Sequence, residues 1–274
     1  MARPSRLVLL GHPVSHSLSP RMQGAALRAA GIDATYEAID VPPGELERVV
    51  DSLRASNGAG NVTIPHKQRM AELCDRLTEP ARSAGAVNAF WMDGDTLVGD
   101  NTDIAGFDAA ARLLLAGRAL PHRVGLIGAG GAAAAVAIAT RTWLGTELLV
   151  WTRRGEAAGA FTRRFAHARA VETPREALAD ADLVVNATPV GLRDDALPFP
   201  IDELGAHAAV LDLVYRPAET ALVLAARASG HRASDGMAML VEQGAAAFVT
   251  WFGVEPHRSV MWQALGREMP GRAH

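Results

Sequence analysis

The stretch VGLIGAGGAAAAVAIA, residues 124–139, decides the fold of this chain. An apolar run typical of a strand leads straight into glycines and then into an alanine-rich helix, the arrangement of a βα turn that holds a pyrophosphate. Gly128 permits a tight turn, Gly130 lets the backbone approach phosphate oxygens, and Ala133 is small enough for close packing of helix on strand. Glycine-rich helix starts also arise from close packing alone, so the neighbouring residues decide between the two interpretations.

A pair of arginines after the next apolar run indicates which dinucleotide binds. The run at residues 148–151 ends in Thr152, Arg153 and Arg154, whereas an NAD site usually has an acidic residue about 20 residues after the glycines. Because one guanidinium group can donate two parallel hydrogen bonds to a phosphate, this segment predicts binding of a 2′-phosphate and therefore of NADP(H). The alternative is a solvated loop with scattered charge. The expected cofactor contacts are Gly128, Ala129, Gly130, Gly131, Ala132, Thr152, Arg153 and Arg154.

Composition and charge exclude several classes of function. With 274 residues, 49% of them hydrophobic, and a net charge of −3, the chain can form two modest cores and has no basic surface for nucleic acid or membrane. Cys74 is the only cysteine, which excludes an intrachain disulfide framework and fits a reducing cytoplasm. The apolar run at residues 7–10 is too short for a signal peptide, and we expect no membrane role. No metal is expected, because no acidic cluster accompanies His12, His16 and His66 and the predicted chemistry needs no metal.

Apolar runs alternate with helical patterns along the chain, which predicts an α/β protein. A hairpin is expected to turn at Asp93-Gly94. Besides the strands on either side of the glycine turn, strands are expected at residues 6–12, 35–41, 60–64, 182–189 and 209–215. Helices are expected at residues 19–30, 43–55, 104–116 and 237–265, in addition to the helix of the glycine turn.

The order of these segments predicts two domains. Residues 1–104 with 239–274 would form a substrate-binding α/β domain, and residues 105–238 a doubly wound Rossmann domain that binds NADP(H). The C-terminal helices would return to the first domain. Since no Ser/Gly linker occurs, a helix is expected at the boundary near residue 105.

Four peptides in the first half place polar residues just after expected strands, where α/β sheets form their sites. Hydroxyls and amides can bind a carboxylate and several alcohols without adding net charge. Lys67 and Asp103 are the pair in these peptides that couples a proton donor to a counter-charge. The peptides are SHSLSP at 15–20, NVTIPHK at 61–67, VNA at 87–89 and GDNTD at 99–103.

Together with GAGGAA, NATPVGL and the late DGMAMLVEQGAAAF, these peptides make the chain resemble the shikimate dehydrogenase family over residues 11–251. The resemblance implies an NADP-dependent interconversion of 3-dehydroshikimate and shikimate, in the chorismate pathway to the aromatic amino acids. It makes Lys67 the acid/base together with Asp103, and it also places Asp103 against the substrate hydroxyls. The residues that it places against the substrate are Ser17, Ser19, Thr63, Asn88, Tyr215 and Gln243. Those that it adds against the cofactor are Thr188 and Gly236.

The chemistry of Lys67 can be considered without the family. Hydride transfer to a ketone leaves an alkoxide, so a proton donor must lie within hydrogen-bond reach of that oxygen. An ammonium supplies both charge and proton. Asp103, if adjacent, would orient Lys67 and hold its charged form, which opposes easy proton release. The sequence leaves open which residue dominates proton transfer.

Several of these residues also have purely structural interpretations. Ser19 would cap the helix that begins near it, and Asp103 would cap the helix that follows it. Asn61 and Asn88 would satisfy loop backbone, and Gln243 would be a hydrogen-bonded amide in an apolar core.

Two other functions compete with the main prediction. One is an enzyme with relaxed use of quinate or NAD; the resemblance links quinate use to Thr at position 19 and an acidic residue after the second Rossmann strand, and neither is present. The other is a non-catalytic, NADP-sensing regulator, against which Lys67 and Asp103 argue. A close analogue such as aminoshikimate stays open as substrate, and the chain would act as a monomer or homodimer.

Overall fold

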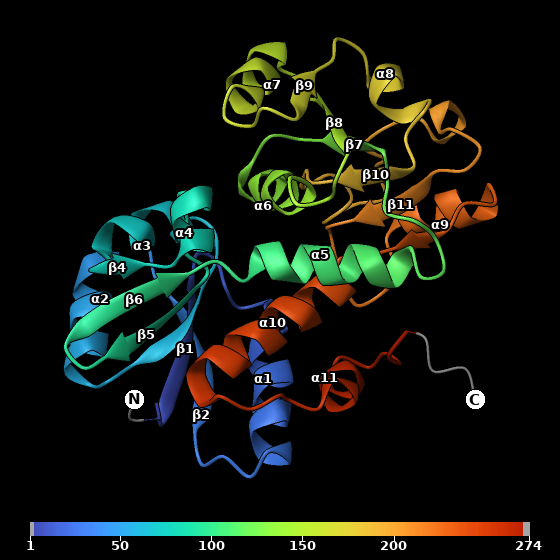
Figure 1. Cartoon of the computed structure of the whole chain (residues 1–274). Helices are drawn as coiled ribbons and strands as arrows, with labels where there is room; N and C mark the ends of the chain where they lie inside the picture. The colour runs from blue at the N-terminus through green and yellow to red at the C-terminus, as the bar shows by residue number, and fades with distance from the viewer. Residues whose placement is uncertain (1–2, 271–274) are drawn as a thin grey trace. The chain divides into compact units, whose positions relative to one another are not determined.

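Two compact units, each built on its own six-stranded sheet, make up the protein (Figure 1). The computed structural model describes residues 3–270. The first unit comprises the residues up to Gly106 and those from Leu240 onward, and the second runs from Phe107 to Met239. The α/β class is therefore confirmed, and the C-terminal helices belong to the first unit.

The sheet of the first unit has the strand order β2-β1-β3-β5-β6-β4. Strands β1, β2 and β3 are parallel, so their carboxyl ends meet at one edge of the sheet. Strand β5 runs antiparallel to β3 and β6, and the β5-β6 hairpin closes through Gly94 and Asp95, one residue further along than expected. The bounds are β1 Arg6–Gly11, β2 Thr35–Asp40, β3 Ala59–Val62, β4 Arg76–Leu77, β5 Ala89–Asp93 and β6 Thr96–Asp100.

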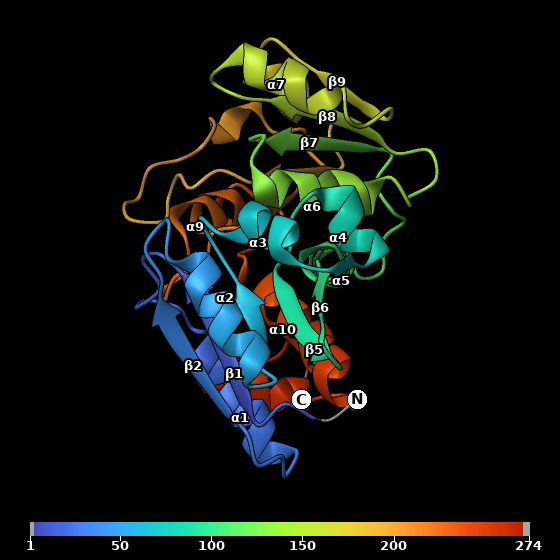
Figure 2. The same ribbon diagram turned by 90° about the vertical axis from the view of Figure 1, so that its left-hand side faces the viewer.

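Helix α2 shows how the first unit buries its core. Its buried residues Leu46, Val50 and Leu53 lie on one face and join the apolar cluster that contains Val8 and Leu10 of β1. Figure 2 shows α2 in front of β1. The helix bounds are α1 Ser19–Ala29, α2 Leu46–Ala55, α3 Lys67–Leu73, α4 Glu79–Ala84, α10 Met237–Phe252 and α11 Arg258–Ala264.

Two helices differ from the sequence prediction. Helix α2 begins at Leu46 rather than residue 43, because Pro42 to Glu45 form a turn in which Glu45 N–H donates to Pro42 O at 3.1 Å. The segment predicted as one long C-terminal helix is two helices, α10 and α11, and the break begins at Gly253, whose φ of 69° lies outside the helical region.

The sheet of the second unit is entirely parallel, with the order β12-β11-β10-β7-β8-β9. Counted from β7, the strands follow the order of a Rossmann fold: β8 and β9 are added on one side of β7 and β10 to β12 on the other, so the strand order reverses between β7 and β10. Ligands in such folds bind outside the carboxyl ends of the strands, at that reversal. The bounds are β7 Arg123–Ile127, β8 Glu147–Trp151, β9 Ala168–Ala170, β10 Leu183–Asn186, β11 Ala209–Asp212 and β12 Ala233–Ser234.

The core of the second unit contains buried apolar strand residues such as Ile127, Leu149, Val184 and Val210. Strands buried on both faces read as continuous apolar runs, as expected for a parallel sheet with helices on both sides. The helices are α5 Asp103–Leu114, which starts in the first unit, α6 Gly131–Thr140, α7 Gly155–Thr162, α8 Pro174–Leu178, α9 Ala221–Ala228 and a 3₁₀ turn at Ile201–Glu203. Across residues 3–270, no helix has the length and apolar character needed to cross a bilayer.

Candidate functional site

The carboxyl ends of β1 and β3 bring two of the predicted peptides together in the first unit. Thr63, just after β3, donates its N–H to Leu10 O at 2.8 Å. A Cβ at Gly11 would lie 2.4 Å from the Thr63 methyl group, so glycine at position 11 is what lets Thr63 approach β1. Ser17 follows β1 in the adjacent loop and is half-buried.

Lys67 and Asp103 form the central ion pair of this unit. Lys67 is the first residue of α3, Asp103 is the first residue of α5, and Lys67 Nζ donates to Asp103 Oδ2 at 2.6 Å. The Lys67 side chain is 26% exposed and that of Asp103 is 12% exposed. Since an ammonium has three protons and this bond uses one, Lys67 retains donors for a ligand.

Asn88 holds the other oxygen of the carboxylate. Its Nδ2 donates to Asp103 Oδ1 at 2.8 Å, and its Oδ1 accepts the Thr102 N–H at 2.7 Å. The same Nδ2 lies 3.3 Å from Gln243 Oε1, while Gln243 Nε2 donates to Leu240 O at 2.9 Å. Asn88 is 2% exposed. Both oxygens of Asp103 are therefore fixed, and Lys67 is held by a rigid partner.

Lys67 is also chemically singular in this chain. Of the 27 lysine and arginine residues, it is the only lysine. Arginine keeps its charge at any physiological pH, whereas lysine can release its proton. A protein that uses arginine at every other cationic position keeps the one releasable ammonium beside Asp103.

The alternative interpretation of Ser19 as a helix cap is wrong. Helix α1 begins at Ser19 itself, Leu18 is the cap residue, and no side-chain cap bond forms there. Instead, the Ser17 hydroxyl accepts the Ser19 N–H at 3.2 Å, and Ser19 is 7% exposed. The loop after β1 thus presents Ser17 at the start of α1.

The glycine turn of the second unit has the form predicted from the sequence. Strand β7 ends at Ile127, Gly128 has φ of 111°, Gly130 is the cap residue of α6, and Ala133 is fully buried. A Cβ added at Gly130 or Gly131 would meet nothing within 4 Å. Ala129 and Ala132 are half-buried. The turn therefore leaves open space and main-chain N–H groups at the start of a ten-residue helix.

The segment after β8 presents two cationic side chains to solvent. Arg153 and Arg154 are exposed, and Arg154 is the cap residue of α7. The Thr152 hydroxyl donates to Arg154 O at 2.5 Å and so closes a tight loop. No acidic residue stands between β8 and α7, in agreement with a phosphate-binding rather than a 2′-hydroxyl-binding loop.

Three further predicted residues lie in loops at the carboxyl edge of this sheet. Thr188 follows β10 and Tyr215 follows β11, and both are half-buried. Gly236 donates its N–H to Val214 O at 2.9 Å, and a Cβ at position 236 would lie 2.3 Å from Leu213 O. Glycine at 236 is required by this close approach.

The charged loop after NATPVGL, to which the sequence assigns no role, is tied down by Arg216. The Arg216 guanidinium donates to Asp194 O at 3.0 Å and to Asp195 Oδ1 at 2.7 Å. Arg216 is the residue after Tyr215, so the loop is joined to the segment that carries that tyrosine.

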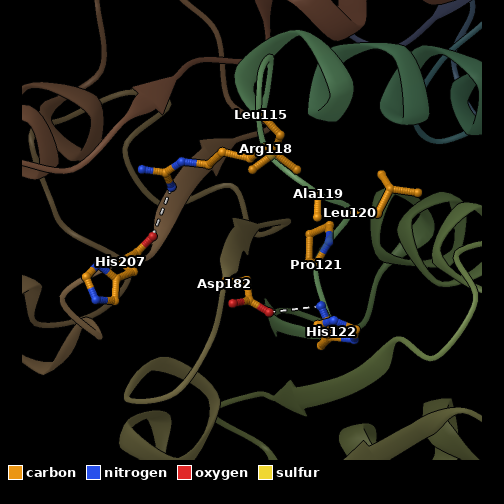
Figure 3. Close-up of a pocket in the computed structure, with 8 residues that line it drawn as sticks. All are labelled: Leu115, Arg118, Ala119, Leu120, Pro121, His122, Asp182 and His207. Atoms are coloured by element: carbon orange, nitrogen blue, oxygen red, sulfur yellow. Dashed lines mark hydrogen bonds between the residues drawn. The ribbon is translucent and has the colours of Figure 1, made fainter.

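A surface hollow of about 370 Å³ lies at the opposite, amino edge of the second sheet (Figure 3). There Asp182 Oδ2 accepts the His122 N–H at 2.9 Å, and Arg118 donates to His207 O at 3.1 Å. The first bond joins the starts of β7 and β10, and the second joins the segment before β7 to the segment before β11. The hollow is therefore distinct from the edge that carries the glycine turn.

Sequence reasoning missed three buried polar residues at the two sites. Thr102 supports Asn88, and Asn186 pairs with Asp212 at the ends of β10 and β11. Thr102 lies within the quoted peptide GDNTD, so its position before Asp103 was the available signal. The Asn186–Asp212 contact depends on strand register, which the sequence does not show.

Histidine does not build a metal site in the described chain. Within residues 3–270, no group of three or more His, Cys, Asp and Glu side chains is placed to hold a metal ion. His66 is buried and its Nε2 donates to Val41 O at 2.6 Å, and His12 pairs with Asp40 at the surface.

Fold and site together define the class of two-unit α/β proteins that combine a polar ligand site with a dinucleotide-binding turn on a parallel sheet. The model of the shikimate dehydrogenase substrate binding domain matches residues 9–90, and that of the shikimate 5′-dehydrogenase C-terminal domain matches residues 236–265. A shikimate dehydrogenase (NADP(+)) of Rubrobacter xylanophilus is 47% identical over 271 residues, which cover 95% of each chain. The chain belongs to the shikimate dehydrogenase family.

Solved structures agree with this membership. The shikimate 5-dehydrogenase of Thermus thermophilus, in complex with NADP(H) and shikimate, has a TM-score of 0.87 and 39% identity, covering 95% of this chain and 98% of the other. The quinate dehydrogenase of Corynebacterium glutamicum, in complex with NAD, has a TM-score of 0.88 and 31% identity, covering 95% and 98%. The same fold thus occurs in a shikimate 5-dehydrogenase and in a quinate dehydrogenase, so the fold by itself does not decide between these two activities.

Proposed function

We propose that this chain is an NADP-dependent oxidoreductase that reduces 3-dehydroshikimate to shikimate with NADPH, reversibly, in the chorismate pathway. The observation that carries the proposal is the Lys67–Asp103 pair at 2.6 Å, held by Asn88. Membership of the shikimate dehydrogenase family supports it, as does similarity to an enzyme solved with NADP(H) and shikimate.

The first unit supplies the groups that bind the substrate. Hydroxyls at Ser17, Ser19 and Thr63 follow β1 and β3 and can bind a carboxylate and alcohols through neutral donors. Asn88 and Gln243 add amides, and Tyr215 adds a phenol. We assign the carboxylate to the two serines and Tyr215, and the ring hydroxyls to the remaining residues.

Lys67 is assigned the proton transfer at the reacting oxygen. Reduction of the ketone develops negative charge on that oxygen, and the Lys67 ammonium both stabilises the charge and donates the proton. Asp103 orients the Lys67 side chain between turnovers through the 2.6 Å hydrogen bond. In the reverse direction, the neutral amine accepts the hydroxyl proton. Asp103 has no cation besides Lys67 among its hydrogen bonds in the described chain, so the two act as a unit.

The second unit fits a dinucleotide. Open space at Gly130 and Gly131, the positive φ of Gly128 and the parallel strand order match a pyrophosphate on the α6 N-terminus. NADPH, when bound, supplies the hydride. Arg153, with Arg154 beside it, would hold the 2′-phosphate through paired N–H donors.

The remaining expectations are part of the same proposal. Residues 1–104 with 239–274 bind the substrate, and residues 105–238 bind the cofactor. The reaction takes place in the cytoplasm, where NADPH is produced and where a single, half-buried cysteine requires no disulfide partner. The protein acts as a monomer or homodimer without a nucleic-acid partner.

A four-way assay tests the proposal. Purified protein is incubated with shikimate or quinate, each with NADP⁺ or NAD⁺, and the absorbance of the reduced cofactor is followed. We expect the highest kcat/KM with shikimate and NADP⁺. Faster turnover of quinate with NAD⁺ would make the chain a quinate-using dehydrogenase. The absence of turnover in all four combinations would favour a non-catalytic, NADP-sensing regulator.

A further inference from the structure

The carboxyl edge of the second sheet contains a fully buried carboxylate for which the proposed mechanism has no use. Asp212 ends β11, and Asn186 ends the neighbouring strand β10; the two are register partners and both are 0% exposed. Burying a carboxylate costs free energy unless hydrogen bonds compensate for the lost water. A buried carboxyl group at the ligand-binding edge of the sheet therefore calls for a reason.

Both oxygens of Asp212 accept hydrogen bonds. Oδ1 accepts from Asn186 Nδ2 at 2.8 Å and from Val214 N–H at 3.1 Å, and Oδ2 accepts from the Thr220 hydroxyl at 2.7 Å. Burial raises the pKa of the Asp212 carboxyl and Asp235 adds to the rise, whereas the three donors lower it. The donors come from three segments: β10, the loop after β11, and the start of α9.

Asp212 is the nearer of two acceptors that fix the direction of the Asn186 amide, since Asn186 Nδ2 also donates to Val190 O at 3.4 Å. Since the amide nitrogen of Asn186 donates to the carboxylate, its oxygen must point to the other side. That oxygen accepts the Thr188 N–H at 3.0 Å and the Thr188 hydroxyl at 2.7 Å. The Thr188 hydroxyl in turn accepts the Val190 N–H at 3.2 Å. The chain of bonds from Asp212 thus shapes residues 186–190.

This loop lies directly against the glycine turn. Ala187 donates its N–H to Ile127 O at 2.8 Å, and a Cβ at Gly128 would be 3.1 Å from the Thr188 methyl group. On the other side, the bond to Val214 fixes the loop after β11, and Val214 O accepts the Gly236 N–H. One carboxylate therefore orders both the loop that carries Thr188 and the loop that binds the Gly236 N–H, and these two residues are predicted cofactor contacts.

We propose that Asp212 is a positioning residue for NADP(H), acting through Asn186 on Thr188 and through Val214 on Gly236. The inference rests on the proposed function, because it concerns the cofactor site of that function. The two loops require a hydrogen-bond acceptor at the position of Asp212 Oδ1. Asparagine at position 212 can supply that acceptor, and the Thr220 hydroxyl can rotate to accept from the new amide, whereas alanine at position 212 supplies no acceptor.

Calorimetric titration of NADPH, without substrate, tests this role in the wild type, Asp212→Asn and Asp212→Ala. We expect Asp212→Ala to raise the Kd about tenfold or more, the effect of one lost buried hydrogen bond with its partner left unsatisfied. Asp212→Asn should stay within about threefold of the wild type, a rescue by the conservative variant. The KM for shikimate at saturating NADP⁺ should change less than the KM for NADP⁺ in Asp212→Ala.

Two control variants separate positioning from loss of stability. Val184→Ala removes buried methyl groups in the middle of β10, and Asp182→Ala removes a carboxylate that accepts main-chain N–H groups at the opposite end of the same strand (Figure 3). Both should lower the Tm and leave the Kd for NADPH unchanged. An equal rise in Kd in Val184→Ala at a matched Tm loss would overturn the inference.

The remaining outcomes are also decisive. If Asp212→Ala does not fold, Thr188→Val removes the last hydroxyl of the chain of bonds at a half-buried position and should raise the Kd in the same way. Wild-type affinity in the folded alanine variant, or in Thr188→Val, overturns the positioning role and leaves the proposed function standing. A wild-type protein that binds no NADPH contradicts both.

Discussion

Replacing Lys67 should remove proton transfer and leave most substrate binding intact. Lys67→Ala deletes the donor at the reacting oxygen but leaves Asp103 Oδ1 bonded to Asn88. General acid catalysis contributes about 10²- to 10⁴-fold, which corresponds to about 3–5 kcal/mol of the barrier. One hydrogen bond to the substrate is worth about 1 kcal/mol, so the KM for shikimate should rise less than about tenfold.

Steady-state kinetics with shikimate and NADP⁺ measure this difference. Lys67→Arg is the informative companion, since it keeps the charge and a partner for Asp103 but cannot release a proton at neutral pH. Arg69→Ala, on the exposed side of the same helix and paired with Glu47 and Glu72, is the matched control. A loss of less than about tenfold in kcat for Lys67→Ala, or full activity in Lys67→Arg, would refute the role given to Lys67.

Three further outcomes are expected. Arg153→Ser should raise the KM for NADP⁺ by about tenfold and leave that for NAD⁺ nearly unchanged, because only the former carries the 2′-phosphate; equal rises would contradict the phosphate assignment. Gly236→Ala should lower the free energy of unfolding by about 1–3 kcal/mol in urea, since the new Cβ would lie 2.3 Å from a main-chain oxygen, whereas Gly155→Ala, with open space around it, should be nearly neutral. Hydrogen bonding from Arg54 lowers the pKa of the Asp75 carboxyl, so this group stabilises the fold above its unfolded pKa of about 4, and the contribution disappears as the pH falls through the folded value. Asp75→Asn should lower the free energy of unfolding by at most about 1 kcal/mol at pH 7, because the Arg54–Asp75 pair is partly exposed, and should not lower it in strong acid. An equal loss of stability in acid would contradict this link between the Asp75 pKa and stability.

The parts of the fold that could be predicted are those set by local pattern. The run of residues 124–139 has strand, turn and helix in one segment, and the structure has β7, Gly128 and α6 there. Strands β4, β9 and β12 were not predicted, because each has only two or three residues, too few for a periodic pattern. Their existence depends on pairing with a neighbouring strand.

The candidate site shows the same division. Lys67 and Asp103 could be singled out by residue type, and the structure brings them within 2.6 Å. The alternative interpretation of Ser19 as a helix cap was wrong because the Ser17 hydroxyl, two residues earlier, takes the Ser19 N–H. The support of Asn88 by Thr102 depends on tertiary contacts that no spacing rule encodes.

The sole lysine permits a direct measurement at the proposed acid/base. Protein labelled with ¹⁵Nζ-lysine should give a single side-chain resonance, since no other lysine is present. Saturation with shikimate should shift this resonance, and Asp103→Asn should shift it in the free protein. A resonance that does not move when shikimate saturates the active enzyme would show that the Lys67 ammonium does not meet the substrate, which contradicts the account.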